Sequence, residues 1–386
     1  MNKVFLIFLT YTTAVFSQSF ANPTYNPYNL TGAGSNNAPF FVDINDDGDY
    51  DCFSGLGNGF TAYYRNNGTI TFPAFDDWYY ANSFGIYDAG NNAKPAFADM
   101  DFDGDYDLYQ GEAGAQILYF RNTGSSTSAN FTYIISNPAG ISNLGASVAP
   151  ALIDIDDDGD FDLFTGEVFG NIYYYENLGT KFNANFSGRF TNPFGLSDVG
   201  AYSSPSFSDV DFDGDYDAFI GNQAGNIIFF RNDGTSTDPA FGVAVTNPFG
   251  LSNVITYASP TFIDINNDDK EDLFVGSGNG VTFYFRNTTV VNVEEEQNSS
   301  FVELKAYPNP VSNILNISSR NVDLDQAELS VYSILGEKLN LSSSKYGTGA
   351  SINFSDLAPG IYILVIKNDL VNYTTKIIKS TRWIWI

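Results

Sequence analysis

Histidine is absent from this chain of 386 residues, and cysteine occurs once, at Cys52. Without histidine the chain lacks the side chain that serves most often as a general acid or base, which argues against catalysis. One cysteine cannot form an internal disulfide. Basic residues are also few, because 17 Lys and Arg stand against 45 Asp and Glu and give a formal net charge of −28. This balance disfavours nucleic acid or an anionic membrane as a partner, since phosphate binding needs clustered Lys and Arg.

Long hydrophobic runs are equally scarce. One apolar stretch, residues 4–16, follows a lysine and has the length of a signal-peptide core, which is too short to span a bilayer. Val15 and Ser17 are small enough to flank cleavage before Gln18. We therefore predict a signal peptide at 1–17 and a mature chain without a transmembrane span, which is soluble or anchored by other means.

What the chain has in abundance is acid, concentrated in a nine-residue loop that occurs five times. Successive copies start 56, 55, 55 and 55 residues apart. A period this regular predicts one structural unit repeated along the chain. The copies begin at Asp43, Asp99, Asp154, Asp209 and Asp264.

The loop carries Asp or Asn at its first, third, fifth and ninth positions in every copy. The seventh position is expected to contribute its backbone carbonyl, which explains why Lys270 is tolerated there. Alternating oxygen ligands on a sharply turned loop suit a hard cation with about six to eight ligands, and we therefore predict about five calcium ions. The predicted ligands are Asp43, Asn45, Asp47, Asp49 and Asp51; Asp99, Asp101, Asp103, Asp105 and Asp107; Asp154, Asp156, Asp158, Asp160 and Asp162; Asp209, Asp211, Asp213, Asp215 and Asp217; and Asp264, Asn266, Asp268, Lys270 and Asp272.

The remaining loop positions narrow the kind of site. The sixth position is Gly in four copies and Asp269 in the fifth, which fits a turn that needs positive φ. An EF-hand is excluded, because its loop requires Glu at the twelfth position and no copy has one. The alternative is an acidic turn without metal. Carboxylates about 4 Å apart repel by roughly 4 kcal/mol per pair at an effective dielectric constant of about 20, so such a turn would be costly.

The sequence around each loop indicates β-structure. A proline lies four residues before the first Asp of every copy, and a glycine lies twelve residues after it. Short alternating segments flank the loop, as at 205–209 and 216–220, and a third such segment follows at 226–232. A phenylalanine further on, such as Phe241, marks a fourth. Four short strands per unit with glycine-rich turns are typical of a propeller blade, so the predicted fold is all-β, a five-bladed β-propeller of 55-residue repeats.

The two ends of the repeat region complement each other. The fifth unit stops after Asn287, before its fourth strand. Phe20 lies 23 residues before Asp43, the same spacing as that between the last phenylalanine of a later unit and the next loop. We therefore predict that the N-terminal strand completes the last unit and closes the ring, in a propeller domain at 18–288.

Aromatic and basic side chains keep the same period. With 35 Phe and 25 Tyr, large side chains can fill the surfaces between units. Adjacent aromatic pairs, such as Tyr63 and Tyr64, would send one ring to each face of the sheet. The arginine after a pair is expected to bond carboxylates across strands or to offer polar contacts at a rim. These arginines are Arg65, Arg121, Arg231 and Arg286, and Glu176 breaks the series.

The repeats resemble the FG-GAP or VCBS-type repeats of integrin α-chain propellers and of many bacterial surface proteins. The stretch FSDVDFDGDYDAFIG at 207–221 carries the resemblance most clearly, and the likeness covers about 18–288. It implies a calcium-stabilised β-propeller of the adhesion or lectin type. Integrin propellers have seven blades, whereas this chain has five units.

A change of composition marks a second domain. Residues 1–300 carry 38 acidic and 9 basic residues, whereas 301–386 carry 7 and 8. Residues 289–300 are polar and lack the phase of strands or turns, which suits a linker. The short strands beyond it predict a small antiparallel Ig-like β-sandwich. These strands are expected at 315–318, 328–333, 351–354, 361–367 and 373–378.

The second domain resembles the C-terminal sorting domain of the type IX secretion system of Bacteroidetes. The resemblance rests on AYPNP at 306–310, VYSILG at 331–336, LAPGIY at 357–362 and KIIK at 376–379. It implies that residues 301–380 engage the type IX secretion machinery, with passage across the outer membrane and release or attachment at the cell surface. The apolar tail at 381–386 departs from the family pattern.

These features favour a secreted or surface-displayed calcium-binding propeller that acts as an adhesion module for a glycan or a protein. One alternative is a polysaccharide-degrading enzyme with paired carboxylates, for which Glu112, Glu167 and Glu176 are candidates outside the loops. No catalytic residue is assigned, because histidine is absent and calcium accounts for the clustered Asp residues. The other alternative is a structural component of a surface layer.

Overall fold

The computed structural model describes residues 16–32, 34–291, 304–319, 323–333, 338–367 and 372–380. The described chain is all-β and divides into two compact units, Met1–Asn292 and Val293–Ile386. Most of the predicted signal peptide, most of the predicted linker and the apolar tail lie outside the described residues.

The first unit contains one antiparallel four-stranded sheet for each acidic repeat. In the first four repeats the strands of a sheet follow one another along the chain, whereas the fifth sheet takes its fourth strand, β2, from the N-terminal side. The acidic loop joins the first strand of each sheet to the second. The sheets are β3 (Ala38–Val42), β4 (Asp51–Gly55), β5 (Thr61–Tyr64) and β6 (Tyr79–Tyr80); β7 (Lys94–Ala98), β8 (Asp107–Gly111), β9 (Ile117–Asn122) and β10 (Phe131–Ser136); β11 (Ala149–Ile153), β12 (Asp162–Gly166), β13 (Ile172–Tyr175) and β14 (Phe190–Thr191); β15 (Ser204–Ser208), β16 (Asp217–Gly221), β17 (Ile227–Phe230) and β18 (Val245–Thr246); and β19 (Ser259–Ile263), β20 (Asp272–Gly276), β21 (Thr282–Phe285) and β2 (Thr24–Tyr25). Short 3₁₀ turns occur at η1 (Pro27–Asn29), η2 (Ala81–Phe84), η3 (Pro138–Gly140) and η4 (Pro193–Gly195).

Neighbouring sheets approach so closely that the second strand must end in glycine. A Cβ atom on Gly221 would lie 2.2 Å from the carbonyl oxygen of Ala258, which immediately precedes β19 of the next sheet. A Cβ atom on Gly276 would lie 2.1 Å from the carbonyl oxygen of Asn37, which precedes β3 of the first sheet. The glycine that marks each repeat in the sequence is therefore needed where one sheet meets the next, and the fifth sheet meets the first.

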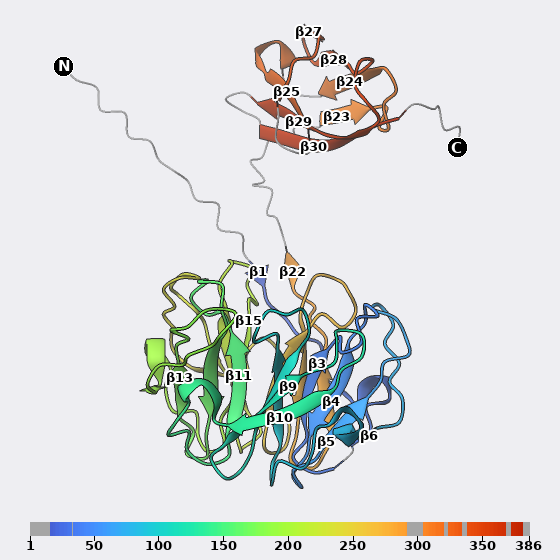
Figure 1. Cartoon of the computed structure of the whole chain (residues 1–386). Coiled ribbons are helices and arrows are strands. Elements are labelled where there is room, and N and C mark those ends of the chain that lie inside the picture. Colours follow the sequence, from blue (N-terminus) through green and yellow to red (C-terminus); the bar gives the residue numbers. More distant parts are fainter. Residues whose placement is uncertain are drawn as a thin grey trace, which may run out of the picture. The chain divides into compact units, whose positions relative to one another are not determined.

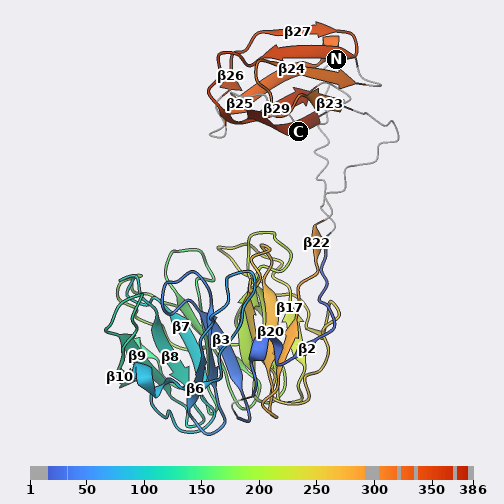
Figure 2. The ribbon, with the colours of Figure 1, turned by 90° about the vertical axis from the view of Figure 1, so that its right-hand side faces the viewer.

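The first strands of the sheets form a closed circuit. β3 contacts β7, β7 contacts β11, β11 contacts β15, β15 contacts β19, and β19 contacts β3. Figures 1 and 2 show the sheets standing side by side around a common centre. Separate hydrophobic clusters fill the spaces between neighbouring sheets, and the one between the fifth and first sheets joins Phe274 and Tyr284 to Phe41 and Tyr64. Tyr63 lies in the cluster on the other side of the first sheet, so the adjacent aromatic residues do serve two different interfaces.

The segment before the first repeat belongs to the fifth sheet. Thr24 of β2 pairs with Tyr284 of β21 in antiparallel register. Phe20 forms a bridge with Asn287, in the same way as Phe241 pairs with Asn232 in the fourth unit. Phe20 is also buried in the cluster between the fourth and fifth sheets. A further two-stranded pairing joins β1 (Phe16–Ser17) to β22 (Val290–Val291).

The second unit is built from antiparallel four-stranded sheets, ordered β23-β24-β28-β27 and β26-β25-β29-β30. Residues from both orders, among them Leu315 and Leu364, share one buried cluster. Asn309 of the first motif donates to the carbonyl oxygen of Lys376 and accepts from the amide of Ile378, at 2.8 Å each, so the first and last motifs of this unit are joined. The elements are β23 (Leu304–Tyr307), β24 (Ile314–Ser319), η5 (Leu324–Gln326), β25 (Glu328–Ser333), β26 (Lys338–Leu339), β27 (Ser343–Tyr346), β28 (Gly349–Asn353), β29 (Gly360–Lys367) and β30 (Asn372–Lys379).

Candidate metal centres

The first carboxylate of each acidic loop shapes the loop around itself. In the fourth copy, Asp209 accepts the backbone N–H of Asp213 and that of Gly214, at 3.1 Å each. The other copies have the same pair of bonds, including the fifth, where Asp264 accepts from Asp268 and Asp269. These bonds bend the chain so that the side chains of the following alternate positions turn back toward the first.

In three of the loops, the first, third and fifth positions lie close together. In the second, third and fourth loops, one carboxylate oxygen from each of the three positions lies within 4.8 Å of the others. In the first and fifth loops the third position is Asn45 or Asn266, whose amide donates to the ninth-position carboxylate at 3.0 Å and 2.8 Å respectively. The clusters are Asp99, Asp101 and Asp103; Asp154, Asp156 and Asp158; and Asp209, Asp211 and Asp213.

The seventh position contributes more than the backbone carbonyl that we expected. The side chains of Asp105, Asp160 and Asp215 are buried, with 8%, 8% and 7% exposed. Burial, followed by repulsion from neighbouring loop carboxylates, raises the pKa of each of them to about 6. The signal for this inward side chain is the presence of Asp at the seventh position in four of the five copies.

The ninth position ties the loop to the third strand of its sheet. In the third unit, Asp162 accepts the backbone N–H of Asn177 at 2.7 Å and the hydroxyl of Tyr174 at 2.9 Å. Equivalent bonds form in the first, second and fifth repeats. In the fourth repeat Phe229 replaces the tyrosine, and Asp217 keeps only the hydrogen bond from the backbone amide of Asn232. The sequence predicts these carboxylates as metal ligands. In the structure they accept most of their hydrogen bonds from the third strand of the sheet.

Buried carboxylate oxygens without a hydrogen-bond partner test whether a cation fits these loops. Within the described residues, each loop has at least one such oxygen, and the fourth loop has three. An unpaired buried carboxylate is costly, because burial removes the water that would solvate its charge. A hard cation that takes oxygen ligands would satisfy these atoms. They are one oxygen of each of Asp49, Asp105, Asp160, Asp211, Asp215, Asp217 and Asp268.

Backbone conformation explains the glycine at the sixth position. The φ angle of Gly214 is 95°, and nothing lies within 4 Å of the place that its Cβ would occupy. Glycine is therefore favoured by the backbone alone, and the fifth loop meets the same demand with Asp269 at a φ of 61°. The fourth position also has positive φ, as at Phe102 and Phe212, which the alternating pattern of the loop did not predict.

Arginine side chains reach the loops from the third strands. Arg121 lies 2.5 Å from Asp101 and 3.2 Å from Asp103, and Arg231 lies 3.0 Å from Asp211. Arg65 and Arg286 approach the fifth position of their loops at 3.9 Å and 3.4 Å. In the third unit Glu176 takes the place of the arginine. Of the two roles considered for this series, these contacts favour pairing with carboxylates.

Two of the acidic residues outside the loops anchor tight turns. Glu112 accepts the backbone N–H groups of Gly114 and Gln116, and Glu167 accepts those of Phe169 and Asn171, at 2.5 to 2.9 Å. Both side chains are buried. Their hydrogen bonds account for them as parts of the fold.

The likeness to known proteins resides in the second unit. Residues 305–380 match the family model described as the secretion system C-terminal sorting domain. This class of domain engages the type IX secretion machinery, and its presence indicates a protein that is secreted or displayed on the outer cell surface. No helix in the described part of the chain is long and apolar enough to cross a membrane.

Other comparisons carry little. No curated protein matches the chain. Two solved structures are similar at a TM-score of 0.31, both of BBS1N in complex with ARL6DN, one soaked with lead and the other with mercury. The first is 10% identical and covers 87% of this chain and 96% of that one; the second is 11% identical and covers 95% and 98%. At this TM-score neither likeness supports an argument about fold or function.

Proposed function

We propose that the first unit is a five-bladed β-propeller of the FG-GAP or VCBS type, stabilised by about five calcium ions. The closed circuit of first strands and the contact of the fifth sheet with the first support the ring. The completion of the fifth sheet by β2 supports it as well. After export by the type IX system, this unit would act as an adhesion module that binds a glycan or a protein.

The observation that carries the calcium proposal is the set of unpartnered buried carboxylate oxygens. They occur at the seventh position of the first four loops and at the fifth position, Asp268, of the fifth loop. Several carboxylates held this close repel one another, and a divalent ion relieves both the repulsion and the lost solvation. Calcium fits best among hard cations, because it accepts irregular sets of oxygen ligands and is abundant outside cells.

Exposed aromatic rings on turns support the binding role. Phe72 and Phe182, which lie in equivalent turns of the first and third units, are 79% and 61% exposed. Phe169 is 75% exposed. Rings of this kind offer apolar faces to a sugar or a protein side chain, and loops on a rigid scaffold commonly bind ligands. The bonds of Glu112 and Glu167 to turn amides make the polysaccharide-degrading alternative the weaker one.

A glycan array probed with the purified full chain tests the proposal. We expect capture of at least one glycan or surface protein in calcium, loss of capture with a chelator, and weaker capture by a variant in which Phe72, Phe169 and Phe182 are serine. Calcium-dependent melting would verify that the variant folds. Release of soluble sugars from polysaccharide would favour the enzyme instead. Neither capture nor release would favour the structural component and overturn the proposed adhesion.

A further inference from the structure

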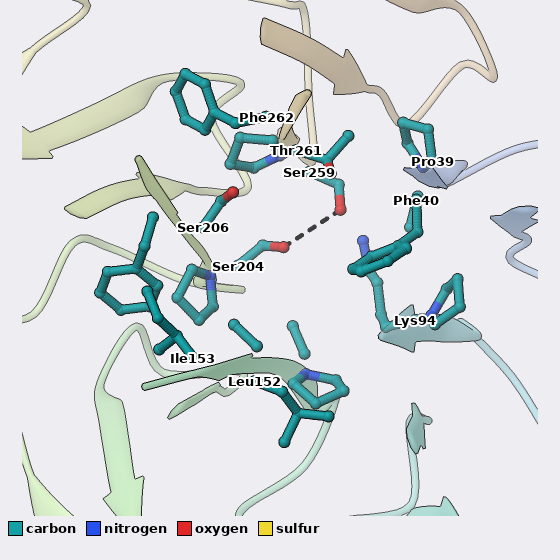
Figure 3. A pocket seen from close by; sticks show the side chains of 18 of the residues that line it. Pro39, Phe40, Lys94, Leu152, Ile153, Ser204, Ser206, Ser259, Thr261 and Phe262 are labelled. Carbon is teal, nitrogen blue, oxygen red and sulfur yellow. Dashed lines mark hydrogen bonds between the residues drawn. The ribbon is translucent and has the colours of Figure 1, made fainter. Parts of the chain in front are cut away.

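A cavity of about 310 Å³ lies at the centre of the circuit of first strands. Residues of β3, β7, β11, β15 and β19 all line it. Figure 3 shows its side chains converging from several strands. The volume falls at the lower end of the range of small-molecule sites.

One level of the cavity wall is formed by the residue that precedes the repeat's proline in each first strand. All five residues pair with the glycine that ends the second strand, so they lie at the same height. Three different side chains occur there, and the only charged one at this level is a lysine. The five are Ala38, Lys94, Ala149, Ser204 and Ser259.

The lysine faces hydroxyl groups across the cavity. β7 has β3 and β11 as neighbours in the circuit, so the strands opposite it are β15 and β19. Lys94 on β7 therefore looks across at Ser204 and Ser259, whose hydroxyl oxygens lie 3.2 Å apart. Figure 3 shows these three side chains turned into the cavity. The neighbouring strands contribute Ala38 and Ala149 at this level, which are small and leave the space between the polar groups open.

The ammonium group lacks a counter-charge. In the part of the chain that the structure describes, it forms no hydrogen bond and no ion pair, and Lys94 is partly buried. Burial lowers the pKa of Lys94 to about 8, which leaves the amine mostly protonated at neutral pH. The acidic groups of the wall, Asp154 and Glu271, together with Tyr216, belong to the loop ends of their strands, whereas Lys94 is the first residue of β7. A buried charge without a partner is costly, and an anion at this point would offset that cost.

We propose that the central cavity binds a small organic carboxylate, held between the Lys94 ammonium and the hydroxyls of Ser204 and Ser259. A single ammonium matches a monoanion, and each serine can donate one hydrogen bond to it once the hydrogen bond between the two hydroxyls is given up. The alanines and Phe40 provide apolar contacts for the rest of the ligand. Glu271 at the other end disfavours an anion of higher charge, such as phosphate.

Calorimetric titration of the full chain in saturating calcium tests this site. The probes are acetate for an aliphatic acid, glucuronate for a sugar acid and inorganic phosphate for a multivalent anion. We expect one equivalent of acetate or glucuronate to bind, with affinity reduced about tenfold or more in Lys94→Met. Ser204→Ala combined with Ser259→Ala should weaken binding severalfold. Lys181→Met is the matched control, because it removes the same charge from a turn of the third repeat, outside the cavity, and should bind like the natural chain.

The variants should fold, because replacing a buried ammonium by an apolar side chain of similar length removes an unpaired charge. A thermal melt of each variant in calcium checks this. Binding of neither carboxylate by the natural chain would overturn the proposal. Equal affinity in Lys94→Met and the natural chain, or binding of phosphate alone, would overturn it too. This titration does not depend on capture in the glycan array, so the two proposals can fail separately.

Discussion

Replacing Phe229 by tyrosine should supply a hydrogen bond that the fourth unit lacks. At the equivalent position of the other units, a tyrosine hydroxyl donates to the ninth-position carboxylate over 2.7 to 2.9 Å. Asp217, which is 1% exposed, has no such donor, and its second carboxylate oxygen is unpartnered among the described residues. The backbone register of β16 and β17 is that of the other units, so the new hydroxyl should reach the same place.

The size of the effect follows from the pKa values of the equivalent carboxyls. Burial raises the pKa of Asp217 to about 8. The pKa is about 7 for Asp107 and Asp162, which accept the tyrosine hydroxyl that Asp217 lacks. A difference of one pH unit corresponds to about 1.4 kcal/mol, and a hydrogen bond to a charged group contributes a similar amount. A carboxyl whose folded pKa lies above its unfolded value of 3.8 loses stability as pH rises to the folded pKa. The unfolded pKa is the same in both chains, so the gain in unfolding free energy should be full above about pH 8 and should be lost below about pH 7, where Asp217 is protonated in both folded chains.

Urea unfolding of the full chain in chelator, where no calcium can take the second oxygen of Asp217, followed by near-ultraviolet circular dichroism at alkaline and acidic pH, measures this gain. Tyr174→Phe in the third unit is the reciprocal control and should lose a similar amount at alkaline pH. If Phe229→Tyr left the alkaline unfolding free energy unchanged while Tyr174→Phe lowered it, the second oxygen of Asp217 would be satisfied in another way.

Three further perturbations have defined outcomes. Lys94 has a folded pKa of about 8 and an unfolded pKa of 10.5. The unfolding free energy of the natural chain should therefore rise by up to about 3 kcal/mol relative to that of Lys94→Met as pH increases between these values. The same pH dependence of the unfolding free energy in both chains would contradict this. Gly214→Ala should lower the unfolding free energy by about 1 kcal/mol, because φ is 95° there and no atom crowds the new Cβ, whereas Asp269→Gly should not lower it. Chelation should lower the melting temperature, since each calcium at about ten times its dissociation constant contributes about 1.4 kcal/mol, and a melting temperature that ignored chelator would count against calcium.

Much of the first unit could be predicted from the phase of the repeat. Proline, the acidic positions and the terminal glycine recur at fixed spacing, and each has a local physical reason that the sequence carries by itself. The terminal glycine is the exception, because its spacing could be read but its reason, the carbonyl of Asn37 close to Gly276, is a contact between residues far apart in sequence. The pairing of Phe20 with Asn287 could also be predicted. The fifth repeat lacks its fourth strand, and Phe20 lies at the spacing before the first loop that this strand has in the other repeats.

The features that could not be predicted depend on side-chain directions, which the spacing of residues in the sequence does not determine. The inward turn of Asp105 and the tie between Asp162 and Asn177 depend on how the loop folds back over its sheet. The arginine contacts likewise depend on side-chain reach. Lys94 shows the limit most clearly, because a single lysine in a row of alanines and serines becomes notable only when the first strands are known to face one centre.

The pairing of β2 with β21 has a consequence for the order of assembly. β2 is synthesised before the five repeats, whereas its partner β21 belongs to the last of them. The two strands can therefore pair only after all the intervening repeats have been synthesised. Contacts between residues so distant in sequence form slowly. Until then, β21 presents an unpaired edge that could recruit a strand from another molecule.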